Sequence, residues 1–554
     1  MRSMHSKRWA LVWVACVAFI AACHADDLDP VGQAKELDDV VRREHAVGQL
    51  TLIFGQRLQA AKGDRASPAI KEFNDATVAQ LVKTYLNNPE DTQNGYRMLS
   101  LLSEMRDPRA LPALLKGLEW RRDVTEEHAV TGAVTMTQIT VPEGEKGKVV
   151  EKICQALDRV EDARGVDNRL RKSFIEVLGK LKDKRATKTL TGVMLNQTQS
   201  QNFLFNILAA QQLIQMRDPD SIPALIQALY LTDPNNPTMR MTDVVPAALV
   251  AIGKPALEPM LKVLRGEDET ANKTVDAYIA AIKRKDPDAA AAMVPRAILS
   301  VDACYTLGKL GFREALDPLI EESKADNETR RFGAALSLVS VQREPGDTAR
   351  IVEAMTRVYD SIQKAQQPQM LVAMRHLYAP EIMPFLLKVA SAAEDELPTI
   401  RMYAFAGRAL LANKAEAQPL KALLDKEEDF KAQLEEYRPA LVVAEECDEN
   451  VDCWIGKLKD KDKTVLRKAA SMLARLGRGN DKAIEALLGL FSHSDLEVRN
   501  EALSSVDFIA VNGSKAAVDR ITELEAIEGG RSIWNNFQRE ALPTRSRLLQ
   551  RGGT

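Results

Sequence analysis

The chain has 554 residues, of which 45% are hydrophobic, 28% are charged and only 5% are aromatic. This length allows several domains or one long repeat array, and few aromatic residues favour a core in which helices pack on helices. The formal net charge of -3 at pH 7 excludes nucleic-acid binding by bulk electrostatics, and no long low-complexity tract indicates disorder.

Residues 1–22 have the pattern of an export signal. Three positive charges, Arg2, Lys7 and Arg8, come first, and an apolar run from Trp9 to Ala22 follows. The run is shorter than the roughly 20 residues that a helix needs to cross a bilayer, so it is typical of a signal sequence.

The apolar run leads into Ile20-Ala21-Ala22-Cys23, which resembles the lipobox of bacterial lipoproteins. The resemblance implies cleavage before Cys23, lipidation of the Cys23 thiol, and a tether formed by residues 23–33. His24 rather than Asp follows the cysteine, which by the Gram-negative sorting rule implies the outer membrane. We therefore expect an exported protein that is lipid-anchored to the bacterial envelope. Cleavage after Ala25, which would remove Cys23, is the alternative.

Two other cysteines form a candidate pair. Cys447 and Cys453 bracket an acidic, turn-like stretch between two apolar helical segments. In an oxidising compartment this spacing predicts a disulfide across a short loop. Free thiols and a metal site are the alternatives, although two thiols without a nearby His are poor zinc spacing. Cys154 and Cys304 lie in helical patterns and are expected to be small core residues.

One pattern recurs along the body of the chain: an apolar helical segment, a short polar turn that often contains Asp or Pro, and a second apolar segment. Leu101 to Leu118 and Leu213 to Leu229 give clear copies. The turns are predicted near Asp107, Asp183, Asp218, Lys254, Phe312, Gln342, Ala379, Asn413, Cys447, Arg478 and Gly513. Most of these positions are about 31–37 residues apart, which predicts a helical solenoid with two helices per repeat. One such pair cannot bury its own apolar face, so the repeats must stack.

The pattern resembles HEAT repeats, including the bacterial variety called PBS-lyase-like, over residues 74–524. The resemblance implies an all-α fold, an α-α superhelix of the HEAT/armadillo type. It also implies a ladder of Asp–Arg hydrogen bonds between neighbouring repeats, with a row of ligand-binding arginines as the alternative. The candidate pairs are Asp326 with Arg330 or Arg331, Asp395 with Arg401, Asp462 with Arg467, and Asp495 with Arg499.

Four segments depart from the repeat. Residues 34–73 are expected to form N-terminal capping helices, including a long helix from Ala34 to Lys62. Residues 124–149 are rich in Thr, Val and Gly and predict a β-hairpin or a long loop, and residues 266–295 predict an insertion with an extra helix. Such insertions either bind partners or are merely tolerated. Residues 525–554 are expected to form a cap with a basic tail.

The sequence contains no Gly-rich phosphate loop, nucleophile elbow or zinc-protease helix motif, and no two of its six His lie at ligand spacing. We therefore expect no catalytic residue, no metal site and no cofactor. The prediction is a non-catalytic scaffold that binds protein partners along the solenoid and the membrane through its lipid, without a nucleic-acid partner. The alternatives are an accessory or assembly factor for a partner enzyme, and an enzyme whose site one sequence does not reveal.

Overall fold

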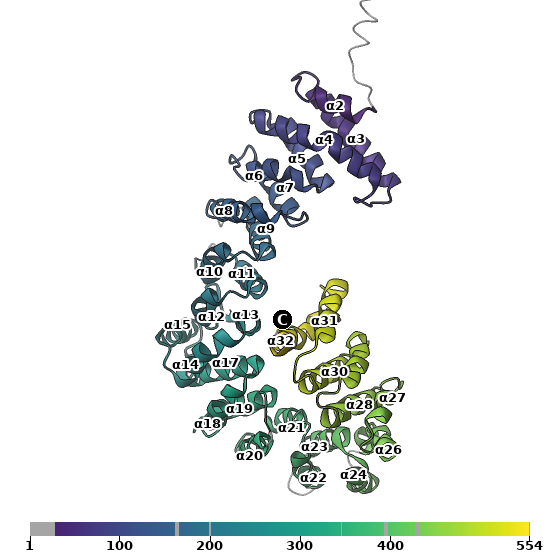
Figure 1. Ribbon diagram of the computed structural model, residues 1–554. Coiled ribbons are helices and arrows are strands. Elements are labelled where there is room, and N and C mark those ends of the chain that lie inside the picture. Colours follow the sequence, from purple (N-terminus) through teal and green to yellow (C-terminus); the bar gives the residue numbers. More distant parts are fainter. Residues whose placement is uncertain are drawn as a thin grey trace, which may run out of the picture. The chain divides into compact units, whose positions relative to one another are not determined.

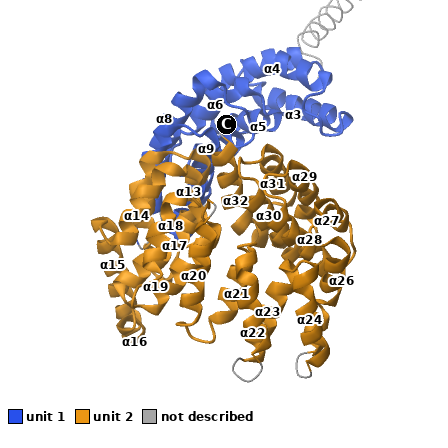
Figure 2. Cartoon of the chain, turned by 60° about the horizontal axis from the view of Figure 1, so that its bottom comes forward, with its two compact units in different colours: residues 1–212 blue, residues 213–554 orange. Residues whose placement is uncertain are grey.

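The computed structural model describes residues 28–552 except for 161–164, 199–200, 345, 393–396 and 428–430. The described residues form two compact units, which comprise residues 1–212 and 213–554 of the chain (Figure 2). Within each unit, helix pairs stack on their neighbours, and regular structure is helical apart from one small hairpin. The predicted fold class, an α-α solenoid of the HEAT/armadillo type, is confirmed.

Unit 1 begins with three helices, and its pairs follow in chain order (Figure 1). Its helices are α2 (Pro30–Glu36), α3 (Arg43–Ala60), α4 (Pro68–Asn87), α5 (Thr92–Met105), α6 (Leu111–Gly117), α7 (Glu126–Met136), α8 (Lys146–Leu157), α9 (Gly165–Leu181) and α10 (Thr187–Leu195), with the 3-10 turns η1 (Pro108–Ala110), η2 (Glu143–Glu145) and η3 (Lys184–Ala186). Helix α11 (Phe203–Met216) crosses the boundary between the units.

Unit 2 continues the helix pairs to the end of the chain. Its helices are α12 (Ile222–Ala228), α13 (Val244–Ile252), α14 (Leu257–Arg265), α15 (Glu269–Lys285), α16 (Pro287–Ala291), α17 (Pro295–Leu310), α18 (Leu316–Glu322), α19 (Glu328–Ser337), α20 (Asp347–Tyr359), α21 (Gln367–Arg375), α22 (Met383–Ser391), α23 (Pro398–Leu411), α24 (Lys414–Lys426), α25 (Lys431–Glu435), α26 (Arg438–Cys447), α27 (Val451–Lys457), α28 (Lys463–Leu476), α29 (Asp481–Leu488), α30 (Leu496–Ile509), α31 (Lys515–Glu528) and α32 (Ser532–Gly552). Its 3-10 turns are η4 (Pro219–Ser221), η5 (Lys254–Ala256), η6 (Arg313–Ala315), η7 (Leu338–Ser340), η8 (Pro380–Ile382) and η9 (Gly489–Ser492), and its strands β1 (Thr232–Asp233) and β2 (Asn236–Arg240) pair antiparallel.

A common turn joins the helices of several pairs. Helix α5 ends at Arg106, whose left-handed conformation (φ 53°) stops the helix, and the Asp107 carboxylate then accepts the backbone N–H of Arg109 at 3.0 Å. Asp183 and Asp218 cap the corresponding turns after α9 and α11. Short polar side chains satisfy the free N–H groups at the start of a helix, so Asp at this position specifies the turn.

The predicted repeat register is confirmed. Each turn position predicted between Asp107 and Gly513 lies at a helix end or in the connection to the next helix. Between turns, each helix buries a stripe at helical spacing, such as Val465, Ala469 and Met472 of α28, which packs against α23, α26, α27 and α30. Burial of each large aliphatic side chain contributes about 1.5–3 kcal/mol.

The β-hairpin or loop predicted for residues 124–149 was wrong, because most of this segment is helical. Helix α7 packs against α5, α6 and α9, and it buries Ala129, Ala133 and Met136 at helical spacing. Gly132 allows the close approach to α6, since a Cβ there would lie 2.8 Å from the carbonyl oxygen of Leu114. The β-branched residues misled the prediction, because tertiary packing outweighs strand propensity here.

One further segment differs in detail from the sequence-based expectation, and another agrees with it. The helix expected from Ala34 to Lys62 is interrupted between α2 and α3, where the Asp39 side chain accepts the backbone N–H of Val41 and so competes with helix formation. The predicted extra helix at 266–295 is present as α15, which packs against α12, α16 and α17.

The last helix closes unit 2 on itself. Helix α32 packs against α30 and α31, which precede it, and also against α13 and α17 from the start of the unit (Figure 1). Gln550 Nε2 donates to the carbonyl oxygen of Val250, and Arg547 Nη1 donates to that of Lys309, each at 2.8 Å. Gly311 makes room for this contact, because a Cβ there would lie 2.8 Å from Cδ of Arg547. The helix pairs of unit 2 therefore form a closed ring.

The basic tail expected at the C-terminus is part of this closure. Arg547 and Arg551 are largely buried, and both form ion pairs with Asp507 of α30, at 2.7 and 3.0 Å. Arg545 pairs with Glu525 of α31 at 2.6 Å. These arginines hold α32 against the ring, so they do not form a solvated tail.

Candidate functional site

A cavity of about 870 Å³ lies inside unit 2, lined by residues of α19, α21, α23, α28, α30 and α32 and of their connections. This volume is within the usual range for small-molecule sites. We call it the arginine-lined cavity, because its wall contains more guanidinium groups than carboxylates. The arginines are Arg313, Arg343, Arg375, Arg467, Arg478, Arg547 and Arg551, and the acids are Glu344, Glu497, Glu501, Asp507 and Glu540.

Glu501 of α30 is the most enclosed acid of this wall, with 1% of its side chain exposed. It accepts hydrogen bonds from Arg375 Nη1 at 2.5 Å, Ser471 Oγ at 2.7 Å and Tyr378 OH at 3.4 Å. Burial alone would raise the pKa of Glu501, but the Arg375 charge and these donors bring it down to about 2. Glu501 is therefore ionised at neutral pH and ties α21 to α28 and α30.

His376 lies beside this ion pair and is neutral. Its Nδ1 lies 2.9 Å from the carbonyl oxygen of Val372 and donates to it, which leaves Nε2 unprotonated, 3.9 Å from Glu501. Burial, followed by the Arg375 charge, lowers the pKa of His376 to about 4. An imidazole with so low a pKa is poorly suited to carry a proton at neutral pH.

A further carboxylate, Asp507, lies at the part of the cavity wall next to α32. Burial would raise its pKa, but the charges of Arg547 and Arg551 lower it below its usual value. Elsewhere in the wall, Arg313 pairs with Asp347 at 2.8 Å and Arg467 pairs with Glu497 at 2.6 Å. Most of the lining charges are thus used in ion pairs that join different repeats.

A second buried polar group lies in unit 1, around His128 of α7. The His128 Nε2 lies 3.0 Å from the carbonyl oxygen of Thr92 and donates to it, so Nδ1 accepts from the Tyr85 hydroxyl, also at 3.0 Å. Burial lowers the pKa of His128 and raises that of Tyr85 to about 12. The group links α4, α5 and α7, and both ring nitrogens of His128 have a hydrogen-bond partner within it.

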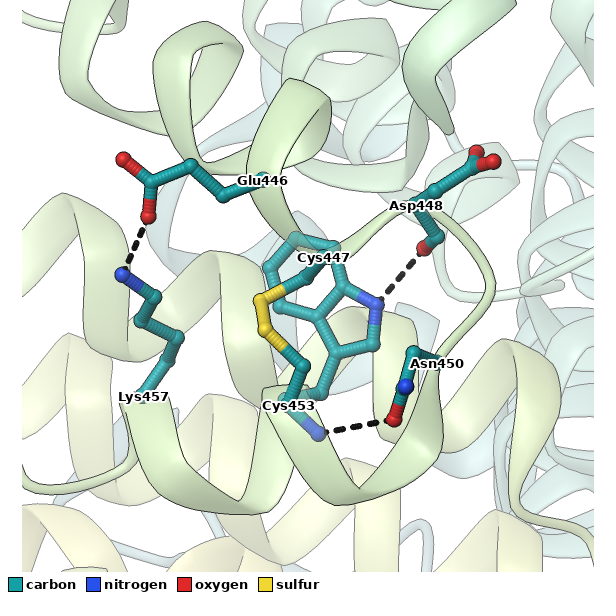
Figure 3. Close-up of a disulfide and its surroundings, with 7 residues drawn as sticks. Glu446, Cys447, Asp448, Asn450, Cys453 and Lys457 are labelled. Carbon is teal, nitrogen blue, oxygen red and sulfur yellow. Dashed lines mark hydrogen bonds and ion pairs between the residues drawn. A yellow bond between two sulfur atoms is a disulfide. The ribbon is translucent and has the colours of Figure 1, made fainter.

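The predicted cysteine pair lies at the junction of α26 and α27 (Figure 3). Neither cysteine lines the arginine-lined cavity. In the structure, Cys447 and Cys453 are joined by a disulfide, with their Cα atoms 5.3 Å apart. The Asn450 side chain accepts the backbone N–H of Cys453 at 3.0 Å, and the indole N–H of the buried Trp454 donates to the carbonyl oxygen of Asp448 at 2.8 Å. Cys154 and Cys304 are free thiols.

Cys23, the predicted lipidation site, lies outside the described residues, as do the signal sequence and Asp395 of the predicted ladder. Within the part of the chain that is described, no group of three His, Cys, Asp or Glu is placed to hold a metal ion. No single described helix is long and apolar enough to cross a membrane, and one pair, Val244–Ile252 with Lys254–Arg265, passes that test only together and is bent by 116°.

The prediction that Asp carboxylates accept the hydrogen bonds of the ladder arginines was wrong. Asp462 and Asp495 cap the starts of α28 and α30 through backbone N–H groups. Arg467 instead pairs with Glu497, and Arg499 with Glu528, in both cases one repeat further along the chain. The acids that precede the helices are held by their own backbone, so the arginines find glutamates on the next repeat.

The remaining ladder arginines also have acceptors other than the predicted Asp carboxylates. Arg330 pairs with Glu322, and Arg401 pairs with Glu427. Arg331 donates to the backbone carbonyl of Asp326 and to that of Ser361 in the following repeat.

The arginine-lined cavity was not predicted from the sequence, although the position of Glu501 indicates a buried acid that needs a partner. It lies on the same helical stripe as the buried residues Val498 and Ser505. An acid on such a stripe is rarely buried without a partner, so its position implies a cation from another repeat. The sequence does not say which repeat, because Arg375 is 126 residues away.

Comparison with known proteins gives one matching family model and several structures of low similarity. The model of the PBS lyase HEAT-like repeat matches residues 207–230, which comprise most of α11, the Asp218 turn and α12. No curated protein matches the chain.

Among solved structures, Kap121p bound to Ste12p is 13% identical with a TM-score of 0.45, covering 90% of this chain and 54% of that one. Kap121p bound to Nup53p is 12% identical with a TM-score of 0.41, covering 92% and 52%. Human deoxyhypusine hydroxylase in complex with glycerol is 17% identical with a TM-score of 0.21, covering 55% and 98%. The chain thus spans about half the length of the Kap121p chains, and its resemblance to PBS-lyase-type HEAT repeats is confirmed at the repeat that contains Asp218.

Proposed function

We propose that this protein is a non-catalytic scaffold that is anchored to the bacterial envelope by a lipid on Cys23 and binds a protein partner along its repeats. The observation that carries the proposal is the stack of helix pairs, in which the helices of one row pack side by side over several repeats. The lipobox-like sequence before Cys23 supports the anchor.

The row α3, α5 and α7 of unit 1 is the best-defined face for a partner. These helices are consecutive neighbours, and they expose Leu52, Tyr96 and Val134, one apolar side chain on each. Ion pairs at 2.7–2.8 Å join neighbouring helices here, between Arg97 of α5 and Glu44 of α3 and between Arg169 of α9 and Glu127 of α7. Exposed apolar side chains together with charged ones are typical of protein-binding surfaces.

Site-specific photocrosslinking tests the protein-binding role. A photoreactive phenylalanine analogue in place of Tyr96 should capture a specific partner in native cells, which mass spectrometry identifies. The same analogue in place of Glu151, an exposed residue of α8, is the control. Identical products at the two positions, or none at Tyr96, would contradict binding along this row.

Cell fractionation tests the anchor separately. The wild-type protein should sediment with membranes and carry a lipid mass on its N-terminal residue, and Cys23→Ala should be released into the soluble fraction. Stable anchoring needs several acyl chains, and the variant lacks the residue that would carry them, so we expect its release to be complete. A wild-type protein that is soluble and has no lipid mass would disprove the anchor, whatever the crosslinking result.

A further inference from the structure

Two arginines of the arginine-lined cavity come together only because unit 2 is closed. Arg343 lies in the connection between η7 and α20, and Arg478 lies in the connection between α28 and α29, 135 residues later. Arg478 Nη2 donates to the carbonyl oxygen of Arg343 at 2.9 Å. Both guanidinium groups lie over the ring of Phe508, with their carbon atoms 4.9 and 5.9 Å from its centroid.

These two positive charges have no carboxylate partner in the described part of the protein. The other five arginines of the cavity wall each lie within 4.0 Å of a carboxylate oxygen. Arg343 is only 8% exposed, and its Nη1 has no hydrogen-bond partner among the described residues. A buried guanidinium without an acceptor is unfavourable, and native proteins rarely retain one without a use.

The electrostatics around Arg343 and Arg478 favour an added negative charge. Burial, and next the neighbouring Arg478 charge, lower the pKa of Arg343 to about 10, so it remains cationic at neutral pH but is destabilised. An oxyanion placed between the two groups would offset the repulsion between them and the cost of burying the Arg343 charge. Guanidinium groups provide paired N–H donors that match the oxygen atoms of carboxylates and phosphates.

The surroundings also offer an apolar contact. The half-buried ring of Phe508 lies beneath the two arginines, and Val341, Val511 and Leu503 add aliphatic surface to the same cavity wall. Arg478 is exposed while Arg343 is buried, so a ligand would meet Arg478 first and extend inward. A ligand held here would therefore combine a charged group with an apolar group.

We propose that Arg343 and Arg478 bind the carboxylate or phosphate group of a small amphipathic anion, whose apolar part packs against Phe508 in the arginine-lined cavity. This site is independent of the proposed scaffold role, since it lies in unit 2 and needs neither the lipid nor the partner-binding row of unit 1. The aromatic–cation contacts would remain in the complex and would hold both guanidinium planes in place.

Calorimetric titration of the full-length protein with four probes tests the proposal. Phenylphosphate and benzoate supply the two oxyanions with an apolar group, inorganic phosphate supplies charge alone, and benzyl alcohol is the neutral comparator. At least one aromatic anion should bind more tightly than both inorganic phosphate and benzyl alcohol, and the better of the two identifies the preferred oxyanion. Equal binding of benzyl alcohol, or equal binding of inorganic phosphate, would overturn the amphipathic site.

Substitutions then assign the site to these residues. Arg478→Gln changes an exposed side chain and should leave folding intact, while the dissociation constant for the aromatic anion rises roughly ten-fold through loss of one charge-assisted contact. Arg343→Gln should have an equal or larger effect. Arg350→Gln, on the exposed side of α20 and outside the cavity wall, removes the same charge and should leave the dissociation constant unchanged. Unaltered binding in both cavity variants would refute the assignment.

Discussion

Arg547 donates a hydrogen bond to the carbonyl oxygen of Lys309, which lies 238 residues earlier in the chain. Its second nitrogen forms an ion pair with Asp507 of α30 at 2.7 Å, so one side chain of α32 contacts both α17 and α30. Because the arginine-lined cavity lies inside the ring, this contact also maintains the cavity.

Replacing Arg547 should therefore weaken the closure of unit 2. Arg547→Met leaves the buried Asp507 with only one arginine partner, and loss of a buried ion-pair partner typically lowers the free energy of unfolding by about 3–5 kcal/mol. Urea denaturation followed by tryptophan fluorescence measures the change. Arg539→Met, on the exposed side of α32, is the matched control and should have little effect. Equal stability of the two variants would contradict a closing role for Arg547.

The Arg375–Glu501 pair should behave as a structural ion pair and not as a catalytic one. Glu501→Gln leaves a buried guanidinium without its carboxylate, so we expect a loss of about 3–5 kcal/mol in the free energy of unfolding. The double variant Arg375→Met/Glu501→Leu removes both charges and should recover most of that loss. Urea denaturation of the three proteins provides the comparison. Failure of the double variant to recover stability would mean that the hydrogen bonds from Ser471 and Tyr378 to the carboxylate contribute more than the ion pair.

Unit 2 should lose stability as the pH falls from about 6.5 toward 4, because the half-buried His376 is neutral in the folded protein. Its pKa is about 4 in the folded protein and about 6.5 for an unperturbed imidazole, so the unfolded chain takes up the proton first. The free energy of unfolding should decrease by about 1–2 kcal/mol between pH 7 and pH 5.

His376→Gln should flatten this pH dependence of unit 2. His128→Gln, a substitution in unit 1, is the control and should leave the slope of unit 2 unchanged. Glu501 titrates in a separate window: its stabilising contribution is present above about pH 4.5 and is lost only as the pH approaches 2. A slope between pH 7 and 5 that persists in His376→Gln would assign the titration to another group.

The inter-repeat arginines should differ in their effect on stability according to burial. Arg499 is buried, forms two hydrogen bonds with Glu528 and lies over the Phe537 ring, whereas Arg467 pairs with the exposed Glu497. Arg499→Ala should lower the free energy of unfolding by about 3 kcal/mol, and Arg467→Ala by about 1 kcal/mol or less. Thermal denaturation of the two variants ranks them, and the reverse order would contradict the assignment of Glu528 as the stabilising acceptor.

The sequence was sufficient to predict the helix pairs and their turns, because these depend on local chemistry. An Asp at the turn caps the next helix, and apolar residues at helical spacing define the buried stripe, so Asp107 and Asp218 marked their repeats correctly. The segment 124–149 was mispredicted because its β-branched residues are held in α7 by packing against three other helices.

The closure and the cavity could not be predicted in the same way. Whether α32 meets α13 depends on small rotations between repeats that accumulate over the whole ring. No local sequence pattern determines the total rotation. The contact of Arg343 and Arg478 at Phe508 follows from the closure, so it too has no signature in the sequence around either arginine. Glu501 indicated only that a buried partner existed.

The disulfide between Cys447 and Cys453 should be present in the protein isolated without reductant and should stabilise the junction of α26 and α27. Cys453 directly precedes Trp454, which is fully buried, so the bond fixes the loop that leads into this core residue (Figure 3). Closing a loop of this length contributes about 2 kcal/mol on the chain-entropy model.

Intact-mass measurement after alkylation, with and without reductant, determines whether the bond forms. We expect the unreduced protein to take up no label at either position, and Cys447→Ser/Cys453→Ser to unfold at a lower urea concentration. Cys154→Ser is the control, since this thiol is free and half-buried and its replacement removes no cross-link. Two labelled thiols at Cys447 and Cys453 in the unreduced protein would rule the bond out and would leave Asn450 and Asp448 as the main constraints on the loop.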